Sequence, residues 1–466
     1  MIRVMTAQQS ILQHRRMTQT QPAKRVSRWT LLALIAAALF AGFAAWQSGI
    51  LNSAPDDLPT PFPAPGTSWA DHLIAGDRNI AEYRARATHQ GDDWLSPSAE
   101  AAALLNRAVM TGRWQDYAAA EAALRVAMAR APGPETRPYP LAARLALALH
   151  RNAQVEPALQ AARADLEFSQ PMAQADATMM RGDVALYRGD WRTAATLYAR
   201  AASMGGSNAV TFRQAFLTER TGDADAARQL WINAANGEGR PSRRTLSFAA
   251  MRLGNLELAR GRWDDAAQWY ARADTLLPGD WHIAALRLQM RALSGDLAGA
   301  TQGMTRLATA HDLPELWDAL AAWRRATGDN EGAKAALARA QAGWTAWQAQ
   351  FPEAAAAHAA EHALIAGERE DALRFAQAAY DSRPYGDTAT LLATALTANG
   401  KVDDALALVR RTQASGWHST ELDRLAFELA ALAGDAPAAE RARADALTRN
   451  PRAFDPAMTL IRFGLH

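Results

Sequence analysis

A recurring pattern with a spacing near 34 residues constrains this chain more than any other feature. Ten turns fall at residues 112, 153, 189, 222, 261, 295, 328, 367, 400 and 434, and successive turns are 33 to 41 residues apart. A glycine marks nine of these ten turns. A period of this length is typical of helix–turn–helix units that stack into a solenoid, in which each unit packs only on its neighbours.

The unit that turns at Gly261 shows the pattern most completely. After the glycine come an aromatic residue, an alanine, a second aromatic, a second alanine and a proline, namely Trp263, Ala266, Tyr270, Ala273 and Pro278. The glycine permits a backbone angle that other residues resist. The small alanines let two helices approach closely, the aromatics fill the seam, and the proline ends the second helix. Sustained two-residue alternation, the mark of a strand, is absent from the sequence.

These residues resemble the tetratricopeptide repeat. Leu253-Gly254 in the first helix, Ala266 and Tyr270 in the second, and the closing Pro278 carry the resemblance best. The chain departs from the family pattern at Glu257, where an aromatic residue is expected. The resemblance implies an all-α fold, a right-handed superhelical solenoid of about ten units that spans about 360 residues. It implies little about function, because function lies in sites and not in folds.

At a finer level the chain is similar to a group of bacterial envelope proteins built from the same repeat. Three segments carry this similarity: GRWQDYAAAEAALRVAMARAP, EHALIAGEREDALRFAQAAYDSRP and NPRAF. Members of the group are exported solenoids without an assigned chemistry, and some are encoded near divalent-metal transport genes. The resemblance implies an exported bacterial protein.

The segment 29–46 is predicted to cross a membrane as a helix. It carries no charge and no proline, and tryptophans stand at both of its ends. Eighteen helical residues span roughly 27 Å, close to the thickness of the hydrocarbon core. Six basic residues and no acid precede it, so the N-terminus is expected in the cytoplasm and the array in the periplasm, on a single-pass anchor in the bacterial inner membrane. A cleaved signal peptide and a buried soluble helix remain alternatives.

These observations predict six parts along the chain. They are a basic cytoplasmic segment (1–28), the transmembrane helix or uncleaved anchor (29–46), a proline-rich linker (47–68), an N-terminal capping helix (69–91), the repeat array (92–453) and a C-terminal capping helix (454–466). The prolines of the linker favour an extended spacer. The two capping helices are expected because open repeat arrays need a cover for each apolar end.

Composition excludes several kinds of chemistry. The chain has no cysteine, so it has no disulfide, thiolate metal site or cysteine nucleophile. Its net charge of +2 argues against a nucleic-acid footprint. Phosphate-binding glycine loops and nucleophile-elbow motifs are absent from the sequence. The sequence therefore predicts a protein that is not an enzyme and needs no cofactor, and that binds other proteins or peptides. The identity of the partner and the oligomeric state do not follow from it.

The partner-binding groove is predicted on the first helix of each unit. Groove-facing positions are expected about 13, 10, 6, 3 and 2 residues before each turn glycine. Applied to three neighbouring units, this rule predicts a groove that includes Met179, Asp183, Tyr187, Phe212, Phe216, Phe248, Met251 and Asn255. Aromatic and thioether groups beside acids favour a peptide. Repeat domains that grip C-terminal carboxylates use a lysine where Met251 stands here, so that mode is not expected.

One motif points to an alternative function. His358, Glu361 and His362 form an H-x-x-E-H sequence, and two histidines four residues apart share one face of a helix. They define an alternative function, an accessory protein for divalent-metal handling. The mixed fold of inverted zinc proteases is not expected here, so polar residues of a repeat remain the favoured interpretation, and no metal site is assigned.

Overall fold

The structural features below come from a computed structural model, which describes residue 58 and residues 68–164, 167–237 and 241–465. The predicted membrane helix at 29–46 lies outside these residues. Contacts divide the chain into two compact units, and the second, residues 57–466, holds every described residue. Within the described ranges, no helix combines the length and the hydropathy of a membrane span.

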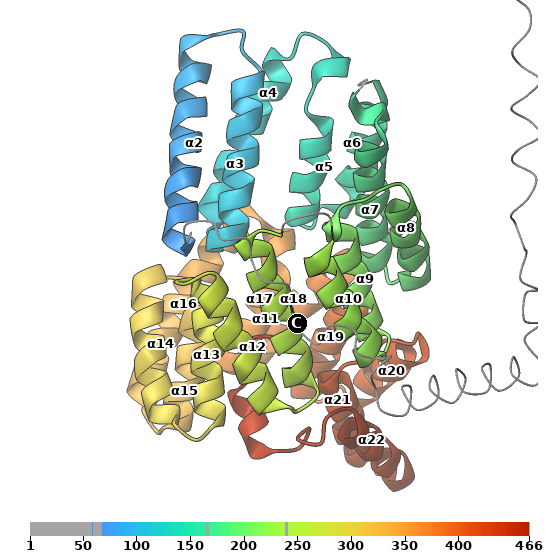
Figure 1. Cartoon of the computed structure of the whole chain (residues 1–466). Helices are drawn as coiled ribbons and strands as arrows, with labels where there is room; N and C mark the ends of the chain where they lie inside the picture. The colour runs from blue at the N-terminus through green and yellow to red at the C-terminus, as the bar shows by residue number, and fades with distance from the viewer. Residues whose placement is uncertain (1–57, 59–67, 165–166, 238–240, 466) are drawn as a thin grey trace, which may run out of the picture. The chain divides into compact units, whose positions relative to one another are not determined.

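Ten antiparallel helix pairs form the described array, and no strand occurs among the described residues (Figure 1). The first five pairs are α3 (Leu95–Thr111) with α4 (Trp114–Arg130), α5 (Tyr139–Ala148) with α6 (Asn152–Ala161), α7 (Pro171–Tyr187) with α8 (Trp191–Ser203), α9 (Asn208–Arg220) with α10 (Ala224–Asn236), and α11 (Arg243–Ala259) with α12 (Trp263–Leu276). The last five are α13 (Trp281–Leu293) with α14 (Leu297–His311), α15 (Pro314–Ala326) with α16 (Asn330–Gln350), α17 (Pro352–Ala366) with α18 (Arg369–Ser382), α19 (Gly386–Ala398) with α20 (Val402–Ala414), and α21 (Thr420–Leu432) with α22 (Ala436–Arg449). Helix α2 (Trp69–His89) precedes the pairs, and short 3₁₀ helices lie at Pro134–Thr136, Ala162–Ala164, Glu167–Ser169 and Pro456–Leu460.

The turn inside each pair contains a residue with a positive φ angle. At Gly261 this angle is +72°, a region that glycine enters without the steric cost of a Cβ atom. Eight other pairs also turn on a glycine, as predicted. The pair α5/α6 differs, because its left-handed residue is His150, with φ of 57°. The turn predicted around Ala153 is therefore displaced, and Ala153 lies inside α6, since no glycine marks the turn in the sequence.

A tyrosine packed on a glycine closes the seam of two pairs. Tyr270 is fully buried, and a Cβ atom built on Gly254 would lie only 2.4 Å from its ring. Tyr198 is equally buried against Gly182, at 2.5 Å by the same construction. Only a residue without a side chain leaves room for these rings. The Leu-Gly and aromatic positions of the sequence pattern therefore face each other across the seam.

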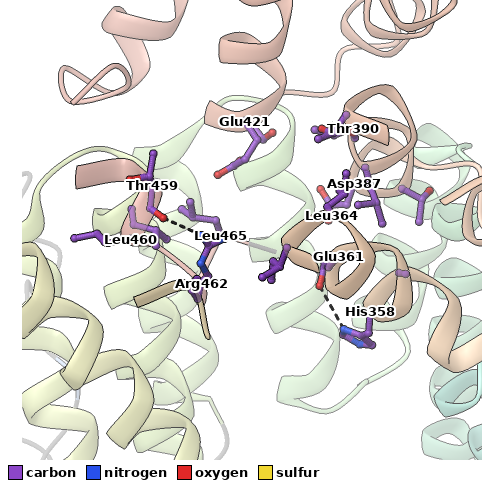
Figure 2. A pocket seen from close by; sticks show the side chains of 18 of the residues that line it. His358, Glu361, Leu364, Asp387, Thr390, Glu421, Thr459, Leu460, Arg462 and Leu465 are labelled. Atoms are coloured by element: carbon purple, nitrogen blue, oxygen red, sulfur yellow. Dashed lines mark hydrogen bonds and ion pairs between the residues drawn. The ribbon is translucent and has the colours of Figure 1, made fainter. Parts of the chain in front are cut away.

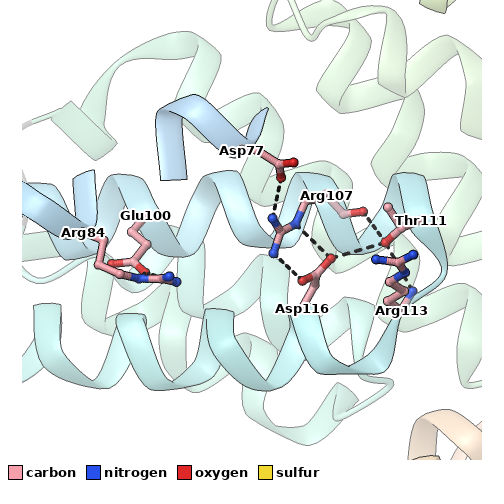
Figure 3. Close-up of polar contacts among 7 residues, drawn as sticks. All are labelled: Asp77, Arg84, Glu100, Arg107, Thr111, Arg113 and Asp116. Carbon is pink, nitrogen blue, oxygen red and sulfur yellow. Dashed lines mark hydrogen bonds and ion pairs between the residues drawn. The ribbon is translucent and has the colours of Figure 1, made fainter. Parts of the chain in front are cut away.

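Ion pairs join the N-terminal helix α2 to the first pair (Figure 3). The Arg107 guanidinium donates two hydrogen bonds to Asp116, at 3.1 and 2.7 Å, and a third to Asp77 on α2, at 2.5 Å. Arg84 of α2 donates to Glu100 of α3 at 2.8 Å. The Arg107 guanidinium therefore links α2, α3 and α4, as expected if α2 covers the end of the first pair.

The array coils until pairs far apart in the sequence touch. The Trp191 indole donates to the carbonyl of Ser415 at 2.8 Å, and the Trp281 indole donates to the carbonyl of Met110 at 3.1 Å. The guanidinium of Arg452 lies 4.3 Å from the ring centroid of Trp263. Because one coil rests on the next, the first helices of the later pairs surround an internal space, which we call the lumen.

Two ends of the array differ from the predicted spacer and cap. Leu58, within the predicted linker, is buried, and its carbonyl accepts a hydrogen bond from Arg272 at 2.9 Å. The predicted C-terminal capping helix (454–466) is a short 3₁₀ helix at Pro456–Leu460 followed by extended chain. Phe454 does pack on Phe427 of the last pair, with ring centroids 4.9 Å apart. The remainder turns into the lumen, because side chains there bind its backbone.

Candidate functional site

Residues 456–465, the short 3₁₀ helix and the chain that follows it, lie in the lumen, and we call them the inserted segment. Gln289, a fully buried residue of α13, binds it through both ends of its side-chain amide. The Gln289 oxygen accepts from the backbone N–H groups of Arg462 and Phe463 at 2.6 and 2.9 Å. Its NH₂ group donates to the Phe463 carbonyl at 3.0 Å. Such bonding recognises the main chain and is independent of its side chains.

The first helices of two other pairs donate hydrogen bonds to carbonyl groups of the inserted segment. The Trp323 indole of α15 donates to Leu460 at 2.8 Å, and Nη2 of Arg220 of α9 donates to Leu465 at 2.8 Å. The ring of Phe463 meets His282 edge-on, with centroids 6.2 Å apart. Burial lowers the pKa of His282 to about 4, so that its imidazole is neutral near pH 7. The lumen therefore already binds one extended peptide, supplied by the chain itself.

Beside the inserted segment lies a cavity of about 720 Å³. Figure 2 shows Leu460, Arg462 and Leu465 on one side of it and side chains of α17 on the other. Most of its other lining residues come from the first helices α15, α17 and α19, and include Ala322, Arg325, Ala357, Glu361, Leu364, Ile365, Asp387, Thr390, Leu391 and Thr394. This volume lies within the range of small-ligand and peptide-side-chain pockets.

Acidic and basic groups both face the cavity. Glu361 lies 3.6 Å from His358, and Asp387 lies 3.7 Å from Nε of Arg220. Burial lowers the pKa of His358, but its bond to Glu361 and the nearby Glu315 carboxyl outweigh burial, so the pKa is raised. Glu421 contributes a third carboxyl group to the lining.

Arg383 stands at one end of the cavity, in the loop between α18 and α19. Only 6% of its surface is exposed, and its guanidinium lies 5.8 and 6.0 Å from the ring centroids of Tyr187 and Tyr385. Its Nε atom is buried without a hydrogen-bond partner. The pKa of the neighbouring His150 falls to about 3, mainly through burial and further through the positive charge of Arg383.

Comparisons with known proteins return solved structures at low similarity. No family model matches the sequence, and no curated protein matches it. Among solved structures, a tetratricopeptide repeat protein from Parabacteroides merdae is 13% identical, covers 56% of this chain and 99% of its own, and has a TM-score of 0.33. The Cut9–Hcn1 hetero-tetramer of APC/C gives 11% identity, 86% and 84% coverage, and a TM-score of 0.37.

The assignment of the repeat rests on the helix pairs themselves. The described chain is an all-α array of helix–turn–helix repeats. The predicted pattern is reproduced by its glycine turns, by its ten helix pairs and by the contacts Gly254–Tyr270 and Gly182–Tyr198.

Four of the eight predicted groove residues are buried, and one of them, Asn255, lies beside the inserted segment, where a Cβ atom built on Gly464 would be 3.0 Å from its side-chain oxygen. Met179 and Met251 are each 8% exposed. The other two are bound by tyrosines of the second helix: Tyr198 donates to Asp183 at 2.8 Å, and Tyr270 donates to Asn255 at 2.9 Å. A buried tyrosine hydroxyl needs a hydrogen-bond acceptor, and in both units this acceptor is the side chain six positions before the turn glycine.

The other four predicted residues belong to aromatic clusters. Phe212 packs on Phe248 and on Trp231, with ring centroids 5.1 and 5.7 Å apart, and Phe248 is 43% exposed. Phe216 packs on Trp417 at 6.3 Å. Tyr187 meets Tyr385, a cavity residue, at 5.5 Å. None of the eight is among the residues that line the cavity, so partner contact by Phe212 and Phe248 stays a prediction.

The H-x-x-E-H motif is split between two environments. His358 lines the cavity and stacks on Trp344, with ring centroids 5.2 Å apart. His362 is buried; its Nδ1 lies 2.6 Å from Asp318 and its Nε2 lies 2.8 Å from the Gln341 side-chain oxygen. Both ring nitrogens of His362 are thus engaged, and no cluster of three metal-ligating side chains occurs among the described residues. The geometry disfavours the metal-handling alternative.

Gln289 and Arg383 are functional candidates that the groove prediction missed. The five-offset rule was applied only to the turns at residues 189, 222 and 261. Gln289 lies six residues before Gly295, where the same rule would have placed it in the groove. Before Gly367 the rule gives Ala354, Ala357, Glu361, Leu364 and Ile365, and all of these except Ala354 line the cavity. Arg383 lies in a loop, and no offset from a turn finds it.

Proposed function

We propose that this chain is a membrane-anchored protein-binding scaffold whose lumen holds an extended segment of a partner protein. One observation carries the proposal: the side-chain amide of Gln289 both accepts hydrogen bonds from the main chain of the inserted segment and donates one to it. Recognition through the main chain accepts many sequences, which suits a scaffold. Stacked repeats form extended concave surfaces that serve such binding.

The cavity beside the inserted segment provides the space for a partner. Apolar side chains such as Leu364 and Leu391 and hydroxyls such as Thr390 and Thr394 line it together. A mixed lining of this kind can cover apolar side chains of a peptide while binding its polar groups. The partner segment would lie between α17 and α19 on one side and the inserted segment on the other.

The membrane attachment in this proposal rests on the sequence. The uncharged segment 29–46 follows six basic residues, which favours a single-pass anchor with its N-terminus in the cytoplasm. The array would then act in the periplasm of a bacterium, at the surface of the inner membrane. There it would collect or organise other envelope proteins, without a reaction of its own.

Affinity capture with a matched pair of variants tests the scaffold. Leu391→Trp fills the cavity with a larger apolar side chain, whereas Leu432→Trp makes the same change at a site on α21 that is 64% exposed. Tagged full-length protein is recovered from solubilised native membranes, and bound proteins are identified by mass spectrometry. We expect partners that the wild type and Leu432→Trp retain and that Leu391→Trp loses. The same set from all three proteins would reject the lumen as the binding surface.

A further inference from the structure

We infer that the Arg383 end of the cavity is an anion site, which binds a carboxylate or similar oxyanion presented by the partner segment. This inference rests on the proposed function, since it concerns the same cavity. It adds the chemical class of the partner: a segment with a negatively charged group at this position.

The first argument is that Arg383 is a buried cation without an anion. It is 6% exposed, and among the described residues it has no hydrogen-bonded or ion-paired side-chain partner. Buried charges in folded proteins are normally paired, because desolvation penalises an isolated charge strongly. The rings of Tyr187 and Tyr385, which meet edge-on, lie beside the guanidinium. Contacts with aromatic rings leave the N–H donors of the Arg383 guanidinium free to bind an acceptor.

The second argument is the balance of charge around the cavity. Two of the lining carboxylates already face bases, Glu361 with His358 and Asp387 with Arg220. Glu421 is the third; one of its oxygens is buried without a hydrogen-bond partner, and no ion pair among the described residues joins it to Arg383. Two of the three lining acids are therefore paired with groups other than Arg383.

Two further guanidiniums on the cavity lack a carboxylate partner. Arg325 donates to the carbonyl of Ile365 at 2.8 Å, and Arg462 donates to the carbonyl of Thr459 at 2.9 Å. Neither forms an ion pair among the described residues. Three carboxyl groups also line the cavity, but no ion pair among the described residues joins any of them to Arg325, Arg383 or Arg462.

Calorimetric titration of the purified full-length protein tests the inference directly. The probes are succinate, for the carboxylate, and inorganic phosphate. We expect saturable binding of succinate to the wild type and at least a tenfold loss of affinity in Arg383→Gln, as for one charge-assisted hydrogen bond. Arg383→Lys, which keeps the charge, should retain part of the affinity. Arg374→Gln, at a guanidinium 62% exposed on α18, is the control and should bind as the wild type does.

The outcomes separate this inference from the proposed function. If succinate competes with a captured partner and Arg383→Gln releases that partner, the anion belongs to the partner segment. If Leu391→Trp releases partners but Arg383→Gln binds them and the probes as the wild type does, the scaffold stands and the anion site is refuted. If phosphate binds through Arg383, and if Leu391→Trp and Arg383→Gln both retain the same partners as the wild type, the site serves a free ion. Both the partner-borne anion and the lumen scaffold are then refuted. Wild-type protein that binds neither probe would also overturn the anion site.

Discussion

Replacing Gln289 with leucine should release the inserted segment from the lumen. The side chain is fully buried and makes three hydrogen bonds to the backbone of residues 462 and 463. Each bond contributes roughly 1 kcal/mol net, so their loss weakens docking of the segment by about 3 kcal/mol. The equilibrium between docked and released segment then shifts by about a hundredfold. A leucine that remained docked would leave three peptide groups without partners, so release is the favoured response.

Limited digestion with trypsin, followed by mass spectrometry, measures this shift. When opening and closing are fast, cleavage follows the population of the open form. Cleavage after Arg462 should therefore accelerate strongly in Gln289→Leu. The control is Gln268→Leu, the same change at an exposed position of α12, which should digest as the wild type does. Equal cleavage after Arg462 in Gln289→Leu and the wild type would refute the account of the inserted segment.

Three further predictions concern the turns, a buried acid and the membrane. Gly189→Ala should destabilise the array more than Gly328→Ala in thermal unfolding: both turns have positive φ, but a Cβ at Gly189 would lie 2.5 Å from the Pro384 carbonyl, and one at Gly328 meets nothing within 4 Å. Burial raises the pKa of Glu315 from 4.5 to about 7, so the folded state holds a proton that the unfolded state releases between these values, and stability falls as pH rises through that window. Glu315→Gln should therefore stabilise the protein at pH 8 and have little effect at pH 4, and equal melting shifts at both would contradict this. Protease added outside spheroplasts should digest the array but spare the residues before 29–46, and full protection of the array would exclude the proposed orientation.

The repeat could be predicted from the sequence because its signals are local. Nine turn glycines, including Gly261, and the seam pair Gly254 and Tyr270 act within one unit, so spacing alone locates them. The turn at His150 was predicted three residues later, around Ala153, because no glycine marks its place in the sequence. The correct number of pairs followed from the period.

The site was predictable only in part, because its geometry depends on long-range contacts. Four of the five positions that the offset rule gives in the unit that turns at Gly367 line the cavity. In the units that turn at residues 189 and 261, a tyrosine such as Tyr270 donates a hydrogen bond to the polar groove residue instead. The return of one coil onto another and the insertion of residues 456–465 join positions up to 245 residues apart, which periodicity cannot reveal.

Site-specific photocrosslinking in intact cells tests the central claim most directly. A photoreactive amino acid replaces Leu391 in the cavity or, as the control, Leu432 on the exposed face of α21. The account predicts a discrete crosslinked partner at position 391 that is absent at position 432, and whose yield falls when Arg383→Gln is added. Crosslinks at position 432 alone, or none at position 391 in cells that contain the native partners, would contradict the claim that the lumen is the binding site.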